Sequence, residues 1–308
     1  MTLSIIIPAF NEAESLPLLL EEIRGVCDLG KIEFEVWVID DGSSDGTYDK
    51  VRDLNKTDSR MKAIRFRRNS GKAAALAEGF RCATGTYVIT MDGDLQDNPA
   101  EIPALLRMLE EGAELVSGWK KVRHDPWHKT IPSKLFNAVT SWVSGLQLHD
   151  FNCGLKAYRS EVVKSLQLYG ELHRYIPVLA HWNGFKVAEK IVEHRARRFG
   201  RSKYGWARFT NGLFDLVTLV FLHRYMRRPL HLFGFVGLFF SLAGFMILAG
   251  FAVSWALTGN IHIRPLMLAG AASMILGVQF VSIGLLGEMI NHRFAPAEPP
   301  PISARTHS

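Results

Sequence analysis

Cysteine is scarce in this sequence. Cys27, Cys82 and Cys153 are the only three among 308 residues, and they lie far apart. An odd, widely spaced set does not suit a disulfide framework, so we expect free thiols in a reducing compartment. A signal-peptide pattern is also missing, because Met1-Thr2-Leu3 leads directly into a strand-like segment and then into the acidic Asn11-Glu12-Ala13-Glu14.

Charged residues are missing from two long segments in the C-terminal third. Residues 230–257 and 266–286 contain no Asp, Glu, Lys or Arg. A helix that crosses a bilayer needs roughly 20 apolar residues, and both segments reach that length. Buried core helices are the alternative, although core helices are rarely so long and so free of charge. We therefore predict two transmembrane helices, at about 230–257 and 266–290, within a membrane region 229–290.

Basic residues around this region indicate its orientation. The loop 258–265 contains one arginine, whereas three arginines precede the first segment and two follow the second. The loop contains Arg264. The first apolar segment is preceded by Arg224, Arg227 and Arg228, and the second is followed by Arg293 and Arg305. Positive charge marks the cytoplasmic side of a membrane protein. We expect an integral membrane protein of the inner or plasma membrane, with both termini and the large N-terminal domain cytoplasmic.

The formal net charge of +6 is concentrated in two basic groups. One group contains Lys120, Lys121, Arg123, Lys129 and Lys134, and the other contains Arg195, Arg197, Arg198, Arg201, Lys203 and Arg208. Such groups attract phosphate, whether of a lipid headgroup, a substrate or a nucleic acid. They flank the membrane segments and have no aromatic platform for single strands, so we expect no nucleic-acid partner.

Strand-like and helix-like segments alternate through the N-terminal part. This rhythm predicts an α/β fold whose mostly parallel sheet is covered by helices on both faces, in a domain at 1–203. An apolar stripe at helical spacing predicts a juxtamembrane amphipathic helix at 204–228, for which a core helix is the alternative. Residues 291–308 read as a disordered cytoplasmic tail. The predicted strands are 3–8, 34–40, 63–66, 87–91, 114–119 and 186–192; the predicted helices are 14–26, 46–55, 73–82, 101–111, 129–146, 161–168 and 175–183.

Two carboxylates follow one of the predicted strands. Asp92 and Asp94 are one residue apart, directly after the apolar segment 87–91. Carboxylates at a strand end can bind a hard cation such as Mg²⁺ or Mn²⁺, whose coordination substrate phosphates would complete. In many proteins an Asp-x-Asp pair is only a polar turn. Its position at the ligand-binding edge of a parallel sheet favours the metal site here.

Three further motifs end strands or begin helices in the same way. Asp41, in Asp40-Asp41-Gly42-Ser43-Ser44, is placed to accept a hydrogen bond from a nucleobase, although a polar turn is the alternative. Residues 8–12 could bracket a base and ribose, or could simply begin a helix. Lys72 after Gly71 could place a cation and backbone amides near an anion, although this pair alone is a weak signal.

Taken together, these motifs resemble those of the family 2 glycosyltransferases with a GT-A fold. The resemblance is greatest to the branch that includes dolichol-phosphate mannose synthase and the bacterial polyprenyl-phosphate glycosyltransferases, and it covers nearly the whole chain. The segments that carry it are 7–12, 40–47, 92–96, 149–156, 173–175 and 197–204, together with the paired C-terminal spans.

The resemblance implies roles for individual residues. Asp92, Asp94 and Gln96 would hold the metal, and the nucleotide pocket would contain Pro8, Phe10, Glu12, Asp41, Lys72 and Asp92. Asp94, Arg197 and Lys203 would carry catalysis, the last two by neutralising the diphosphate. The lipid phosphate would bind Lys120, Arg123, Lys129 and Ser133, for which a solvated or membrane-facing surface is the alternative. Asp150, His173 and Arg174 would shape the sugar and acceptor pocket.

The resemblance also implies a reaction. A single hexose would pass, with inversion, from a UDP-sugar or GDP-mannose to undecaprenyl or dolichyl phosphate, and the enzyme could form a homo-oligomer. A processive polysaccharide synthase is one alternative, but its Gln-x-x-Arg-Trp motif is missing from this sequence. A non-catalytic, membrane-anchored nucleotide-binding partner is the other, and the intact Asp92 and Asp94 disfavour it.

Overall fold

The computed structural model describes residues 2–121, 127–166, 168, 170, 172–196, 229–259 and 265–294. The chain divides into two compact units, Met1–Asp215 and Leu216–Ser308. The predicted juxtamembrane helix at 204–228 lies outside the described residues, as does the predicted tail 291–308 from residue 295 onward. Residues 291–294 belong to the last helix, so the tail prediction began four residues too early. The other predicted domain bounds remain predictions.

The first unit contains one sheet of seven strands in the order β3-β2-β1-β4-β6-β5-β7. Four of its six pairings are parallel, and only β6 runs antiparallel to its two neighbours. The strands are β1 Thr2–Ala9, β2 Glu33–Asp40, β3 Met61–Arg65, β4 Tyr87–Thr90, β5 Leu115–Trp119, β6 Lys156–Arg159 and β7 Val187–Ile191. The prediction of a mostly parallel sheet is confirmed.

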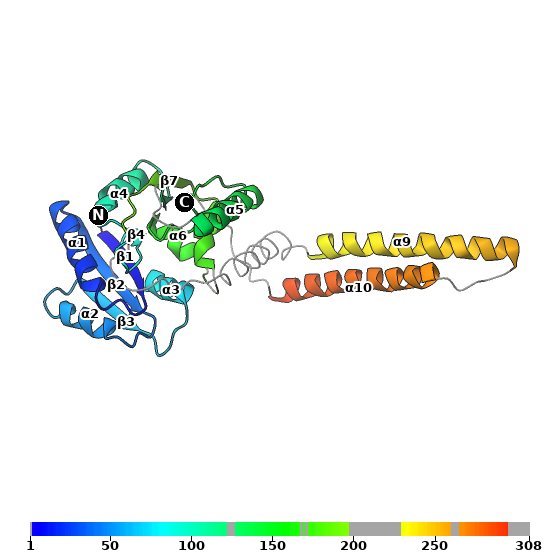
Figure 1. Cartoon of the computed structure of the whole chain (residues 1–308), viewed down its shortest axis with the longest axis horizontal. Helices are drawn as coiled ribbons and strands as arrows, with labels where there is room; N and C mark the ends of the chain where they lie inside the picture. The colour runs from blue at the N-terminus through cyan, green and yellow to red at the C-terminus, as the bar shows by residue number, and fades with distance from the viewer. Residues whose placement is uncertain are drawn as a thin grey trace, which may run out of the picture. The chain divides into compact units, whose positions relative to one another are not determined.

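Helices cover both faces of this sheet because successive strand side chains point to opposite faces. In β1, Ile5 and Ile7 pack in a core with α1, α2 and α4, whereas Ile6 packs in a second core with α3, α6 and α7. Figure 1 shows α1, α2, α3, α4 and α6 around the strands. Their bounds are α1 Leu16–Leu29, α2 Thr47–Asn55, α3 Lys72–Cys82, α4 Ile102–Glu110, α5 Trp127–Ser144, α6 Ser160–Ser165 and α7 Ile176–Trp182, with 3₁₀ helices η1 Pro99–Glu101 and η2 Leu172–Tyr175.

The second unit contains the two apolar helices, α9 Pro229–Thr258 and α10 Pro265–Phe294. Each has 30 residues, so each is about 45 Å long and exceeds the roughly 30 Å of a bilayer's hydrocarbon core. Both are candidate membrane spans by length and composition. Glycines let their backbones approach closely: a Cβ on Gly244 would meet the carbonyl oxygen of Gly270 at 2.6 Å.

Candidate active site

The candidate site lies where the parallel strands end. The carboxyl ends of β1, β2, β4, β5 and β7 meet at one edge of the sheet, as expected for ligand-binding α/β sheets. Because β6 is antiparallel, its amino end, rather than its carboxyl end, reaches this edge, where Lys156 pairs with Thr90. The loop before β6 is held there by a hydrogen bond from Thr90 Oγ1 to the Gly154 carbonyl at 2.9 Å. Segments far apart in sequence therefore meet around Asp92.

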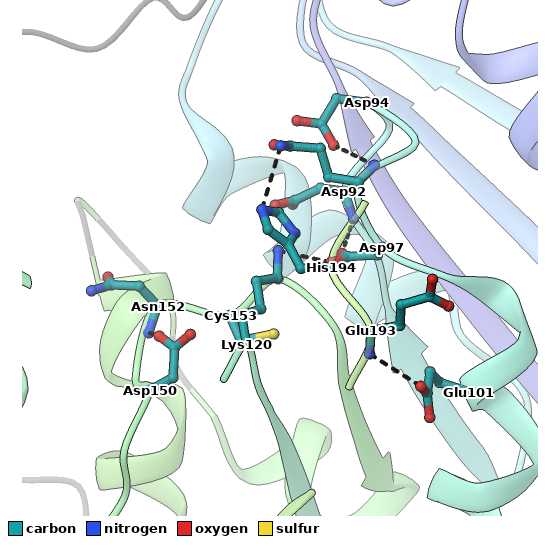
Figure 2. Close-up of polar contacts among 12 residues, drawn as sticks. Asp92, Asp94, Asp97, Glu101, Lys120, Asp150, Asn152, Cys153, Glu193 and His194 are labelled. Atoms are coloured by element: carbon teal, nitrogen blue, oxygen red, sulfur yellow. Dashed lines mark hydrogen bonds and ion pairs between the residues drawn. The ribbon is translucent and has the colours of Figure 1, made fainter. Parts of the chain in front are cut away.

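The Asp92–Asp97 segment forms a tight turn after β4. Leu95 adopts a φ of +62°, in the left-handed region that few bulky residues occupy, so the surrounding structure must hold it there. The Asp94 carboxylate accepts a hydrogen bond from the Gln96 backbone N–H at 3.2 Å. The Gln96 Nε2 lies 3.5 Å from Nε2 of His194, which follows β7 (Figure 2). The turn thus brings two carboxylates, an amide and an imidazole together.

Lysines surround Asp92. Lys72, the first residue of α3, forms an ion pair with Asp92 Oδ1, and the Asp92 side chain keeps 32% of its surface exposed. Burial raises the pKa of Asp92, but the positive charges of Lys72, Lys120 and Lys156 outweigh burial and hold that pKa well below its usual range. Asp92 is therefore an ionised carboxylate at neutral pH. Lys72 is predicted to bind the nucleotide, and it lies beside the predicted metal ligand.

A glycine allows the β6 loop to approach Asp92. A Cβ added to Gly154 would lie 2.6 Å from Asp92 Cγ and 2.8 Å from its Oδ1, which is much closer than carbon atoms pack. The next residues toward β6 are also in the site, since the buried Lys156 donates a hydrogen bond to the Cys153 carbonyl. Burial raises the pKa of the Cys153 thiol to about 12, which disfavours the thiolate.

The predicted nucleotide residues occupy the ends of β1 and β2 and the start of α3. Asp41 is buried, and its two oxygens accept hydrogen bonds from the backbone N–H groups of Ser70 at 2.6 Å and Gly71 at 2.9 Å. Each oxygen retains a second lone pair, so a base could still donate to it. Glu12 accepts a hydrogen bond from Ser15 Oγ at 2.7 Å. Pro8 is in β1, and Phe10 follows that strand.

Lys120 follows β5, and its side chain reaches Asp97, the residue that binds the Asp92 backbone. Its Nζ lies 2.9 Å from Asp97 Oδ1, and only 13% of its side chain is exposed. Asp97 Oδ2 in turn accepts a hydrogen bond from the Asp92 backbone N–H at 3.1 Å. The structure therefore places Lys120, predicted to bind the lipid phosphate, in a buried ion pair next to the predicted metal turn.

The residues predicted for the sugar and acceptor pocket are at least partly buried. Asp150 is buried before β6, where it accepts a hydrogen bond from the Asn152 backbone N–H at 3.0 Å (Figure 2). His173 and the buried Arg174 are in η2, which leads into α7. Their contact with a sugar remains a prediction.

Several predicted residues cannot be placed. Arg123, Arg197 and Lys203 lie outside the described residues. Lys129 and Ser133 are in α5, but their side chains are outside the description as well. The predicted roles of these five residues therefore remain predictions.

His194 and Asp97 were not among the predicted site residues, and neither were Gly154 and Lys156. The predicted strand 186–192 ends just before His194, so the rule that ligands gather at strand ends could have identified it. Asp97 follows the metal motif directly, but no role was predicted for it. Its burial in an ion pair has no local sequence signal, because the partner is 23 residues away along the chain.

The donor set at this turn suits a divalent cation. Among the described residues no group of three or more His, Cys, Asp or Glu side chains is close enough together to form a metal site. Asp92, Asp94 and Gln96 nevertheless offer carboxylate and amide oxygens at one sheet edge, with the His194 imidazole beside Gln96, and Mg²⁺ and Mn²⁺ take such oxygen ligands with substrate oxygens completing the shell. A cation bound at this turn would therefore need further ligands, such as the oxygens of a phosphate substrate.

Sequence comparison identifies the chain's family. The family model "Glycosyl transferase family 2" matches residues 4–167. The dodecaprenyl-phosphate galacturonate synthase of Rhizobium johnstonii is 35% identical over 296 residues, which cover 94% of this chain and 88% of that protein. The undecaprenyl-phosphate 4-deoxy-4-formamido-L-arabinose transferase of Proteus mirabilis is 35% identical over 295 residues, covering 93% and 87%.

Solved structures share the fold. Glucosyl-3-phosphoglycerate synthase of Mycobacterium tuberculosis, in complex with Mn²⁺ and UDP-glucose, aligns with a TM-score of 0.56 at 20% identity over 72% of this chain and 78% of that chain. Mannosyl-3-phosphoglycerate synthase of Rubrobacter xylanophilus aligns with a TM-score of 0.58 at 16% identity, covering 72% and 74%. These similarities confirm the predicted GT-A fold of the first unit.

Proposed function

Since the chain belongs to glycosyl transferase family 2, we propose that it transfers a single sugar from a nucleotide sugar to a polyprenyl phosphate. The relatives that match over most of their length carry polyprenyl-phosphate acceptors in their names. The observation that carries the proposal in the structure is the turn Asp92–Gln96 at the sheet edge, in a chain that also has two candidate membrane spans. Those names contain two different sugars, so the relatives indicate the acceptor, and the transferred sugar must be identified by assay.

Nucleotide binding would use the ends of β1 and β2. Asp41 fixes the loop before α3 through Ser70 and Gly71, and it would accept a hydrogen bond from the base. Asp92, Asp94, Gln96 and His194 would hold a divalent ion, Mg²⁺ or Mn²⁺, which supplies charge neutralisation at the donor diphosphate. The low pKa of Asp92 keeps this ligand ionised in the working pH range.

The acceptor needs little activation. A phosphate monoester has a second pKa of about 6, so the polyprenyl phosphate is largely dianionic at neutral pH and attacks without a strong general base. The chain's task is to orient the acceptor in line with the leaving diphosphate, and attack of this kind inverts the anomeric configuration. Arg197 and Lys203 would neutralise the diphosphate, and Lys129 and Ser133 would bind the acceptor phosphate.

Membrane attachment suits this acceptor. A polyprenyl tail stays in the bilayer, so the site must be held at the membrane surface, and α9 and α10 would provide the anchor. The arginines that flank the two spans favour a cytoplasmic location for the first unit.

The test uses the full chain in nanodiscs, with undecaprenyl phosphate, Mg²⁺ or Mn²⁺ and a panel of radiolabelled UDP- and GDP-sugars. We expect one donor to give a metal-dependent glycolipid. Asp94→Asn should reduce turnover by at least about 100-fold, because it weakens a metal ligand where charge develops. The absence of glycolipid with every donor would refute the acceptor class, and near-normal turnover of a folded Asp94→Asn variant would refute the metal assignment.

A further inference from the structure

We propose that the buried Asp97–Lys120 ion pair positions the Asp92 turn, so that Lys120 acts through Asp97 and not on the acceptor phosphate. The inference rests on the proposed function, because it assigns Asp92 to the cation and donor site. It makes Asp97 and Lys120 positioning residues for the transfer reaction.

The Asp97 side chain holds the start of the turn. It is fully buried, and its Oδ2 accepts the hydrogen bond of the Asp92 backbone N–H at 3.1 Å. Asp97 also forms an isolated bridge with His194, and the neighbouring Gln96 carbonyl accepts a hydrogen bond from the Arg195 N–H at 2.9 Å. The Asp97 carboxylate therefore holds the first residue of the turn, and backbone contacts of Gln96 and Asp97 join the turn to the segment after β7.

Lys120 fixes that carboxylate from another strand. It follows β5, which is separated from β4 by β6 in the sheet, and its Nζ reaches Asp97 Oδ1 at 2.9 Å (Figure 2). Burial lowers the pKa of Lys120, but the negative charges of Asp97 and Asp92 outweigh burial and raise that pKa above its usual range. Lys120 is thus charged and joins the end of β5 to the end of β4.

This geometry argues against a direct role in acceptor binding. The Lys120 ammonium is held against the buried Asp97 carboxylate with only 13% of its side chain exposed, so little of it is accessible to an external phosphate. A group that holds a ligand-bearing turn has a different effect on function. Partners that orient ligands typically change metal affinity by about 10–100-fold when they are removed.

The experiment compares four variants of the full chain. Lys120→Met and Asp97→Asn remove one charge of the pair, and Lys120→Arg keeps the charge. Lys190→Met is the matched control: Lys190 pairs with Glu101, whose other oxygen accepts a hydrogen bond from the Glu193 backbone N–H at 3.1 Å. The control therefore removes a lysine–carboxylate–amide arrangement of the same kind at a site without a hydrogen bond to Asp92 among the described contacts.

Two measurements follow. Amide hydrogen exchange of residues 90–97 in the metal-free protein reports the order of the turn, and Mn²⁺ titration by electron paramagnetic resonance with UDP or GDP reports its affinity. We expect exchange to accelerate and Mn²⁺ affinity to fall by about 10-fold or more in Lys120→Met and Asp97→Asn. Lys120→Arg should recover most of both, and Lys190→Met should match the wild type in both. The KM for undecaprenyl phosphate at saturating donor should change by less than about 3-fold in Lys120→Met.

The outcomes separate this inference from the proposed function. Unchanged exchange at 90–97 in a folded Lys120→Met variant overturns the inference, and so does a raised acceptor KM with unchanged Mn²⁺ affinity. A variant that does not fold is replaced by the double variant Asp97→Asn/Lys120→Met, which removes both charges and leaves no unpaired one; wild-type exchange and affinity there also overturn it. If the wild type makes no glycolipid, the proposed function fails, while the exchange and Mn²⁺ measurements still decide the role of the pair.

Discussion

The contact between Gly154 and Asp92 allows a sharp prediction. A Cβ on Gly154 would lie 2.6 Å from Asp92 Cγ, whereas carbon atoms pack at about 3.5 Å or more, so the carboxylate must move by about 1 Å. Gly154 has an ordinary backbone conformation, so Gly154→Ala adds the side-chain clash without backbone strain. A misplacement of about 1 Å at a reacting site costs about 100-fold in rate, or about 2.7 kcal/mol of transition-state stabilisation.

Stability should change much less than activity. The Asp92 side chain is partly exposed and can yield toward solvent, so we expect a loss of about 1 kcal/mol in the free energy of unfolding, at the low end for overpacking. Gly93→Ala is the matched control, since its Cβ would meet its nearest neighbours, Glu12 and Ile7, at an ordinary 3.6 Å. The control places an alanine between Asp92 and Asp94, whereas Gly154→Ala places one in the loop before β6. Only the second is expected to reduce activity.

The assay measures kcat/KM for glycolipid formation and the thermal unfolding midpoint of each full-length variant in detergent. We expect Gly154→Ala to lose about 100-fold in kcat/KM with a small change in the midpoint. Gly93→Ala should stay within about 3-fold of the wild type. A Gly154→Ala enzyme of nearly full activity, or a Gly93→Ala enzyme with the larger loss, would refute the placement of the β6 loop against Asp92.

Three further predictions concern other parts of the molecule. Burial raises the pKa of Glu35, but hydrogen bonds from a lysine, a serine and a threonine outweigh burial and hold that pKa at about 2. The ionised carboxylate therefore stabilises the fold by about 3 kcal/mol above its ordinary pKa, and this stabilisation disappears as pH falls from about 4.5 toward 2. In Glu35→Gln the unfolding midpoint should depend less on pH across that range. In the helix pair, a Cβ on Gly277 would meet backbone atoms of α9 at 2.6 Å, whereas one on Gly250 meets nothing within 4 Å. Gly277→Ala should therefore lower the free energy of unfolding in SDS by about 1–3 kcal/mol, and Gly250→Ala should match the wild type. Cys82 is partly exposed, and the other two cysteines are buried. Mass spectrometry after brief iodoacetamide treatment of the native protein should therefore find label on Cys82 first. Faster labelling of either buried cysteine would contradict the core packing.

Local sequence patterns were sufficient for most of the first unit's elements. All six predicted strands are present, and their ends shift by no more than two residues; the seven predicted helices shift by no more than three. These elements have apolar residues at the spacing of strands or helices, and the pattern is complete within each segment. The missed strand, β6, has only four residues, and Lys156 and Arg159 are its charged ends. It forms because β4 and β5 offer hydrogen-bonding edges on both sides, which no pattern within those four residues records.

The site shows the same division. Asp41, Asp92 and Asp94 were predictable because a parallel sheet places the ends of its strands at one edge, so a polar motif after an apolar strand is informative by itself. The two uncharged segments likewise indicated candidate spans by length and composition alone. Sequence by itself therefore determined that these three aspartates gather at the edge and that the chain carries an apolar helix pair.

Only the tertiary structure decided which partners these residues meet. The order β4-β6-β5 and the antiparallel direction of β6 bring Gly154 against Asp92 and leave Lys120 to reach Asp97 across an intervening strand. Strand order and direction are set by pairing and burial between segments distant in the chain, and neither leaves a periodic signal in the residues themselves. For that reason Lys120 reads in the sequence as a phosphate ligand, and in the fold as the partner of a buried carboxylate.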